Sequence, residues 1–245
     1  MIRSIRSVIL TLVILSLSAT SSAQLFISVN FGPPALPVYS QPLVPAVGYI
    51  WTPGYWAWSP GWGYYWVPGT WVLAPSPGLL WTPGYWAYDA GLFYWHPGYW
   101  APVVGYYGGI AYGFGYPGTG FFGGYWRDGN YFYNRTVTNV NVTTVKYVYS
   151  QPVTKVTTTT VSYNGGPGGT TVRATAEQEA AARQQKSGPT ADQLKHEQAA
   201  KTDKKLLAAE NKGRPPIAAT AKPADFSGGG VVGASKAGAP YKAPP

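Results

Sequence analysis

A six-residue pattern, Trp-x-Pro-Gly-x-Trp, occurs four times between residues 51 and 100, and no other feature limits the fold of this chain as strongly. The copies span 51–56, 66–71, 81–86 and 95–100. Successive copies begin 15, 15 and 14 residues apart, and together they hold eight of the eleven tryptophans. Self-similarity at a nearly fixed period indicates one supersecondary unit that is repeated. The repeat therefore predicts a built aromatic surface, not a reaction centre.

The first 23 residues have the pattern of a secretory signal peptide. Arg3 and Arg6 precede an apolar run over 8–17, and the small residues 21–23 follow, which predicts cleavage after Ala23. The apolar run is about ten residues long, whereas a membrane-spanning helix needs about 20. We therefore expect the mature chain to be exported and either released or held at the envelope by contacts. We expect no transmembrane segment after cleavage.

Charge divides the chain into two halves. Between residues 24 and 126 the only charged side chain is Asp89, and from Arg127 to Lys242 the chain is basic and polar. The formal net charge of +9 becomes +7 without the two arginines of the signal. Because the chain has no cysteine, disulfides and thiolate metal sites are excluded. Stability must therefore come from packing.

The aromatic half predicts short strands, because runs of aromatic and β-branched residues alternate with Pro-Gly or Gly-rich breaks. Consecutive strands of this kind predict a mainly β fold with an antiparallel meander, in a repeat domain over 48–134 that follows a Pro-rich lead-in at 24–47. The predicted strands lie near 48–52, 55–58, 64–67, 70–74, 79–82, 85–88, 92–96 and 99–101.

The register depends on what Pro-Gly does. If each Pro-Gly is a two-residue hairpin loop, the two tryptophans of one motif face each other, as Trp51 and Trp56 would. However, Pro-Gly favours a type II turn, which suits such hairpins poorly. It could instead form a corner within one strand, with the hairpin turns at 59–63, 75–78 and 89–91. The proposed turn-forming residues are Pro53, Gly54, Pro68, Gly69, Pro83, Gly84, Pro97 and Gly98.

One face of the predicted sheet is apolar throughout, because side chains alternate along a strand with a period of two. This face is either a core or a surface that stacks on a ligand. Its candidate residues are Trp51, Trp56, Trp58, Trp66, Trp71, Trp81, Trp86, Trp95 and Trp100, with Tyr49, Tyr64, Leu73, Leu79, Tyr88 and Phe93 in step.

These residues carry a family resemblance. Tyr49-x-Trp51-x-Pro-Gly-x-Trp56, and the same pattern from Tyr64 to Trp71, resemble the YXWGXW-repeat proteins of bacteria; copies with Leu79 and Phe93 in the tyrosine position follow. The resemblance is strong over 49–100 and looser beyond. It implies a bacterial envelope context, and it transfers no catalytic residue.

The remaining segments differ in composition. Residues 121–126 look like a decayed fifth repeat, and Asp128-Gly129 predicts a hairpin turn after it. The Thr-, Val- and Asn-rich segment 135–164 predicts strands at a sheet edge or a stalk. Capping boxes that begin at Thr175 and Thr190 predict helices of about 10 and 20 residues within 165–213. The Pro-, Gly-, Ala- and Lys-rich residues 214–245 predict a disordered tail.

No constellation for catalysis, cofactor binding or metal binding emerges. The Gly-x-Gly-x-x-Gly pattern over 113–118 neither follows a buried strand nor opens a helix, so we attribute it to chance. Only Asp89 and Asp128 supply carboxylates in the β region, and His96 and His196 lie in different halves. Nucleic acid is also an unsuitable partner, because the aromatic half contains no lysine or arginine beside its rings. We expect no enzyme.

Two functional hypotheses remain. The first is a non-enzymatic structural or interaction protein of the bacterial envelope or extracellular matrix, which associates with itself or with envelope polymers. The second is a glycan-binding module in which exposed Trp and Tyr rings stack on neutral polysaccharide or peptidoglycan sugars. A single sheet cannot bury both of its faces, so one aromatic face must meet water, a partner sheet or a ligand.

Overall fold

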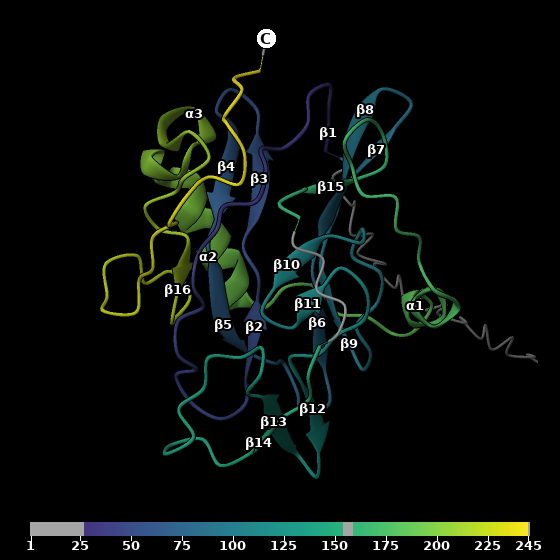
Figure 1. Cartoon of the computed structure of the whole chain (residues 1–245), viewed down its shortest axis with the longest axis vertical. Coiled ribbons are helices and arrows are strands. Elements are labelled where there is room, and N and C mark those ends of the chain that lie inside the picture. Colours follow the sequence, from purple (N-terminus) through teal and green to yellow (C-terminus); the bar gives the residue numbers. More distant parts are fainter. Residues whose placement is uncertain (1–26, 154–158, 245) are drawn as a thin grey trace, which may run out of the picture.

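The computed structural model describes residues 27–153 and 159–244 and is mostly strands, with short helices near the C-terminus (Figure 1). The mainly β fold expected from the sequence is thereby confirmed. The predicted signal peptide lies outside the described residues, as does part of the threonine run at 157–160.

The first two motifs form one bent hairpin. Strand β2 (Tyr49–Thr52) pairs with β5 (Gly69–Leu73), and β3 (Tyr55–Ser59) pairs with β4 (Gly63–Val67), both antiparallel. The turn between β3 and β4 is the hairpin end. Each arm of the hairpin is therefore two short strands joined at a Pro-Gly corner.

The third and fourth motifs repeat this arrangement. Strand β6 (Leu80–Thr82) pairs with β9 (Tyr99–Ala101), and β7 (Tyr85–Asp89) pairs with β8 (Leu92–His96). The hairpin end is Ala90-Gly91, with φ values of 46° and 87° that fit a type I′ turn. All eight strands predicted in the repeat region are thus present, within about one residue at most ends.

The strand pairing corrects our first register. Trp51 pairs with Trp71 rather than with Trp56. The outer strands β2 and β5 therefore pair with each other, as do the inner strands β3 and β4, and the order is not that of a meander. The alternative, in which Pro-Gly is a corner, is the correct one. The hairpin turns at 59–63 and 89–91 are confirmed, whereas 75–78 joins β5 to β6, which belong to different sheets. None of the four Pro-Gly glycines has a positive φ, so none forms a type II turn.

A third hairpin follows the two repeats. Strand β12 (Gly124–Arg127) pairs with β13 (Asn130–Asn134) across Asp128-Gly129, whose φ values of 50° and 73° confirm the predicted turn. A small pair, β10 (Ala111–Gly113) and β11 (Tyr116–Pro117), precedes it. Figure 1 places the third hairpin at the lower end of the molecule.

The Thr/Val/Asn-rich segment contains less strand than its composition predicts. Within the described part of 135–164, only β14 (Val148–Tyr149) and β15 (Tyr163–Asn164) are strands, and each joins the edge of a sheet in parallel. The edge position agrees with the prediction. The rest of the segment turns because asparagine side chains bond to nearby backbone: Asn134 Oδ1 accepts from the amides of Thr136 and Gln151. At the other edge of the β15 sheet, β1 (Ser28–Val29) pairs with β8.

Both predicted capping boxes are present, and both helices are shorter than expected. The capping boxes lie at the starts of α1 (Ala176–Ala182) and α2 (Ala191–Thr202). Asp203 takes an extended conformation and ends α2, after which come a 3-10 turn (Lys204–Leu206) and α3 (Ala208–Asn211). Helix α2 contacts β4 and covers the first repeat copy (Figure 1).

The tail departs most from expectation. Instead of being disordered, residues 214–244 lie against the first repeat copy, where β16 (Ala219–Thr220) pairs in parallel with β5. Ala218, Ala219 and Thr220 are fully buried. Small side chains suit this place because the backbone must come close to the corner: Ala218 O accepts from Gly69 N at 3.0 Å and from Trp66 Nε1 at 3.0 Å.

Candidate functional site

The repeat tryptophans meet as four cross-strand pairs. The ring centroids of Trp51–Trp71 and Trp56–Trp66 are both 5.1 Å apart, with the rings edge to face. In the second copy the distances are 5.3 Å for Trp81–Trp100 and 5.4 Å for Trp86–Trp95, with tilted rings. Such aromatic pairs contribute about 0.5–1.5 kcal/mol each beyond the area that they bury. Each pair joins tryptophans from two different motifs.

The glycine of each motif lies under the first tryptophan of the partner motif. A Cβ atom on Gly54 would be 2.4 Å from Trp66 Cζ2, and one on Gly69 would be 2.5 Å from Trp51 Cζ2. The second copy repeats both contacts, Gly84 under Trp95 at 2.5 Å and Gly98 under Trp81 at 2.4 Å. Glycine is therefore required for space, not for an unusual φ, and two motifs complete each other.

Burial places most of the predicted aromatic face in the interior. Seven of the nine candidate tryptophans are at most 7% exposed, whereas Trp58 and Trp95 are half-buried. Several indole N–H groups donate to backbone carbonyls, such as Trp71 to Pro42, Trp86 to Trp56 and Trp56 to Ala35. A buried indole presents no open face to a sugar ring, so the geometry of this row is that of a core.

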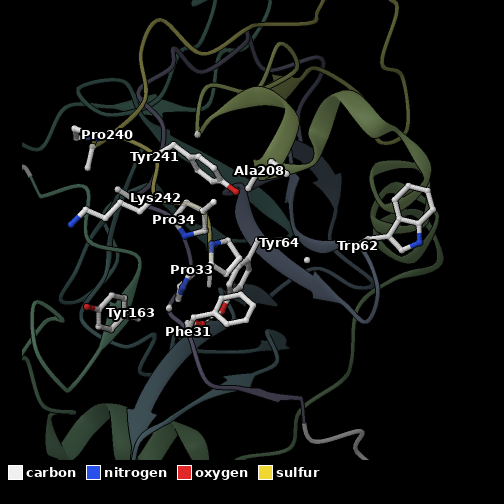
Figure 2. Close-up of a pocket in the computed structure, with 18 residues that line it drawn as sticks. Phe31, Pro33, Pro34, Trp62, Tyr64, Tyr163, Ala208, Pro240, Tyr241 and Lys242 are labelled. Carbon is white, nitrogen blue, oxygen red and sulfur yellow. Dashed lines mark hydrogen bonds between the residues drawn. The ribbon is translucent and has the colours of Figure 1, made fainter.

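Some partly exposed aromatic residues line two grooves instead. The first, which we call the proline groove, is a cavity of about 490 Å³ beside the first copy. Figure 2 shows Phe31, Pro33, Pro34 and Tyr64 on one side and Tyr241 of the tail on the other. Tyr64 donates to Phe31 O at 2.9 Å, which fixes the floor. Lys242 is the one charged side chain that lines it among the described residues.

The second groove, which we call the histidine groove, has a volume of about 650 Å³ and lies between the second copy and α1. Tyr85 and His96 are a cross-strand pair whose rings stack with centroids 4.6 Å apart and planes 6° apart. Burial lowers the pKa of His96 below its ordinary value and raises the pKa of Tyr85 to about 12. The full lining is Pro83, Tyr85, His96, Pro97, Gly98, Tyr99, Tyr106, Ala174, Gln178, Glu179, Ala182, Lys186, Ser187, Gly188 and Pro189.

Sequence reasoning missed both grooves. Tyr85, His96 and Tyr99 alternate with Trp86, Trp95 and Trp100 along their strands and so lie on the opposite face. The other wall comes from residues some 80 positions later, and no local pattern indicated that α1 would pack there. His96 is exposed and lines the groove.

His196, by contrast, is an internal link. It is 2% exposed; its Nε2 lies 2.8 Å from Pro68 O, and its Nδ1 accepts from Ala224 N at 2.8 Å. A carbonyl can only accept, so the proton is on Nε2 and the ring is neutral. Burial lowers the pKa of His196 to about 4. The imidazole therefore joins α2, a Pro-Gly corner and the tail.

Among the described residues there is neither a cluster of metal ligands nor a membrane-spanning helix. Over 27–153 and 159–244, no three His, Asp or Glu side chains gather in a way that could hold a metal ion. In the same ranges, no helix combines the length and the apolar character that crossing a bilayer requires.

Comparison with known proteins agrees with the geometry of the repeat. Residues 47–72 and 77–101 each match the sequence model of a family described as the WXXGXW repeat. Each matched range coincides with one bent hairpin and holds two Trp-x-Pro-Gly-x-Trp motifs. No curated protein and no solved structure matched the chain. The chain therefore contains two copies of the WXXGXW repeat, and one copy of the repeat is one reciprocally packed hairpin.

Proposed function

We propose that this chain is a non-enzymatic structural or interaction protein of the bacterial cell envelope or extracellular matrix, exported by the signal peptide at residues 1–23. The observation that carries the proposal is the use of the repeat tryptophans for internal packing. Because each motif needs its partner to fill the corner, the aromatic residues stabilise the architecture and are not free for chemistry. The four pairs together supply about 2–6 kcal/mol, a large share of the net stability of a domain.

Export and location can be tested together. The full chain is expressed in a bacterium, and cytoplasm, periplasm, outer membrane and medium are probed by immunoblot. The proposal requires a processed product outside the cytoplasm. Leu15→Arg, which interrupts the apolar run of the signal, is the matched control and should leave the unprocessed chain inside. A wild-type chain that stays unprocessed in the cytoplasm contradicts the proposal.

Association is the second requirement of a structural role. The mature chain should sediment with envelope polymers or form oligomers that depend on concentration in analytical ultracentrifugation. A strictly monomeric protein that does not bind envelope fractions would contradict a structural role while leaving the fold intact.

Glycan binding is a second candidate function. The location of the partly exposed rings favours it at the two grooves instead of on the tryptophan row. The tryptophan row is buried, but tyrosines, prolines and an imidazole line two open grooves. Aromatic faces and hydroxyl groups are the surfaces that apolar sugar faces and their polar rims can meet. Pull-down with insoluble polysaccharides and peptidoglycan tests this candidate.

A further inference from the structure

We propose that the histidine groove is a binding site for a short neutral or N-acetylated oligosaccharide. The proposal rests on the second candidate function above and names the site and the class of ligand. It depends on the rings of the groove floor, the rigidity of its wall, a difference between the two repeat copies, and the balance of charge.

The floor of the groove presents aromatic rings from rigid strands. Tyr85 and His96 stack on each other, and Tyr106 packs edge-on against Tyr85 with centroids 5.4 Å apart. Tyr106 is itself held by a hydrogen bond from its hydroxyl to Val172 O. The C–H hydrogens of a sugar ring carry a partial positive charge and are attracted to the negative faces of such aromatic rings.

The opposite wall is fixed in place before any ligand arrives. Ser187 exchanges two backbone hydrogen bonds with Trp100, of 2.9 Å and 3.0 Å, which fasten the loop 186–189 to β9. Gln178 closes the capping box of α1 and is 6% exposed. A preformed groove costs less ordering entropy on binding than a mobile one.

The two repeat copies differ at this place. In the first copy the position of His96 is held by Val67, and that of Tyr99 by Thr70, as the strand registers show. There α2 lies on the corner, with His196 bonded to Pro68 O, and the cavity that remains is about 40 Å³. In the first copy this place is therefore filled by α2. In the second copy it is an open groove lined by the rings of His96 and Tyr99.

Charge and size limit the ligand. Among the residues that the structure describes, Glu179 and Lys186 are the two charged side chains of the lining, of opposite sign, and Lys186 Nζ lies 4.7 Å from the ring centroid of Tyr99. The groove thus has no net charge to attract a polyanion. Its volume of about 650 Å³ lies in the range of about 300–1,000 Å³ that is typical of small-molecule sites. An uncharged oligosaccharide with hydroxyl and amide groups fits this combination.

The test uses the mature protein and isothermal titration calorimetry with chitohexaose, cellohexaose and the anionic oligomer of galacturonic acid. His96→Val and Tyr99→Thr transfer the residues of the first copy into the second, so the fold has a precedent for both. The double variant should lose about 5- to 150-fold in affinity, since it removes two ring contacts of about 0.5–1.5 kcal/mol each. Trp62→Ala, at the rim of the proline groove, is the control and should bind like the wild type.

The outcomes separate the site from the function. Binding of a neutral oligosaccharide that the double variant loses, and Trp62→Ala keeps, supports the proposal. If the double variant binds as well as the wild type, the site is wrong while glycan binding stands. If Trp62→Ala alone loses binding, the ligand lies in the proline groove. Preference for the galacturonate oligomer overturns the class of ligand, and no binding by the wild type overturns both the site and the second candidate function. Thermal unfolding of each variant verifies that it is folded.

Discussion

Replacing a corner glycine by alanine should destabilise the protein through a steric contact with a tryptophan. In Gly54→Ala the new methyl group would lie 2.4 Å from Trp66 Cζ2 and 2.8 Å from Gly69 N. Carbon atoms pack at about 3.5–4.0 Å, so the indole or the facing backbone must move by about 1 Å. The facing backbone is paired with β16, which leaves the indole as the group that gives way.

The cost has three contributions. Overpacking of a core by one methyl group costs about 1–3 kcal/mol. Moving Trp66 weakens its edge-to-face contact with Trp56, worth about 0.5–1.5 kcal/mol. It also strains the buried hydrogen bond from Trp66 Nε1 to Ala218 O, whose full loss costs about 1–3 kcal/mol. Because these contributions overlap, we expect a loss of about 3 kcal/mol in the free energy of unfolding, or about 6–12 °C in Tm.

Urea unfolding followed by tryptophan fluorescence measures this loss. Gly188→Ala is the matched control, because Gly188 has an ordinary φ and no heavy atom within 4 Å of a Cβ atom placed there. A smaller side chain without the indole relieves the contact, so Gly54→Ala should cost much less in a Trp66→Leu background than alone. If Gly54→Ala unfolds within about 0.5 kcal/mol of Gly188→Ala, the steric account of the motif is refuted.

Three further predictions concern other parts of the molecule. Gly98→Ala should cost about as much as Gly54→Ala, because Trp81 Cζ2 lies 2.4 Å from its Cβ position; free energies of unfolding in urea that differ by more than about 2 kcal/mol would show that the two copies are not equivalent. The folded pKa of His196, about 4, lies below the ordinary value of 6.5, so the folded state binds fewer protons between these values. The contribution of His196 to the free energy of unfolding should therefore be fully present above about pH 6.5 and fall by about 3 kcal/mol as the pH drops toward 4. If His196→Gln keeps the full pH dependence of the urea midpoint, His196 is not the cause of that dependence. Thr190→Ala removes the side chain that accepts from Gln193 N at the start of α2 and should cost about 1 kcal/mol in thermal unfolding, whereas Thr190→Ser should cost little, and equal losses would argue against capping.

The strands of the repeat were predictable because their signals are local. Aromatic runs separated by Pro-Gly or by turn residues mark where strands start and stop, and the structure has all eight. The pairing was not predictable from those signals, because Pro-Gly can close a hairpin or bend a strand. The structure distinguishes these through φ: the hairpin ends at Ala90-Gly91 and Asp128-Gly129 have positive values, and the four Pro-Gly glycines do not. What selects the corner is a tryptophan from another motif, which is a nonlocal contact.

The same nonlocal contacts explain the error at the tail. Residues 214–245 contain few large apolar side chains, and a segment of that composition cannot form a core alone. The aromatic hairpin supplies the large surfaces, so its partner needs only a close backbone. Ala218, Ala219 and Thr220 are buried for that reason. The candidate grooves escaped prediction similarly, since one wall of each comes from residues far along the chain.

The third hairpin shows what the minimal unit of the motif is. In 121–126 the glycine is Gly124 and the last tryptophan is Trp126, which pairs with Tyr131. A Cβ atom on Gly124 would be 2.4 Å from the backbone oxygen of Phe132 and 2.6 Å from the ring of Tyr131, which lies over it as Trp66 lies over Gly54. Tyr131 thus occupies the place of the partner tryptophan. One aromatic ring on the neighbouring strand is therefore enough to pack over the glycine, and a whole second motif is not needed. Two motifs in one hairpin satisfy this requirement reciprocally, which accounts for two motifs in each copy of the repeat.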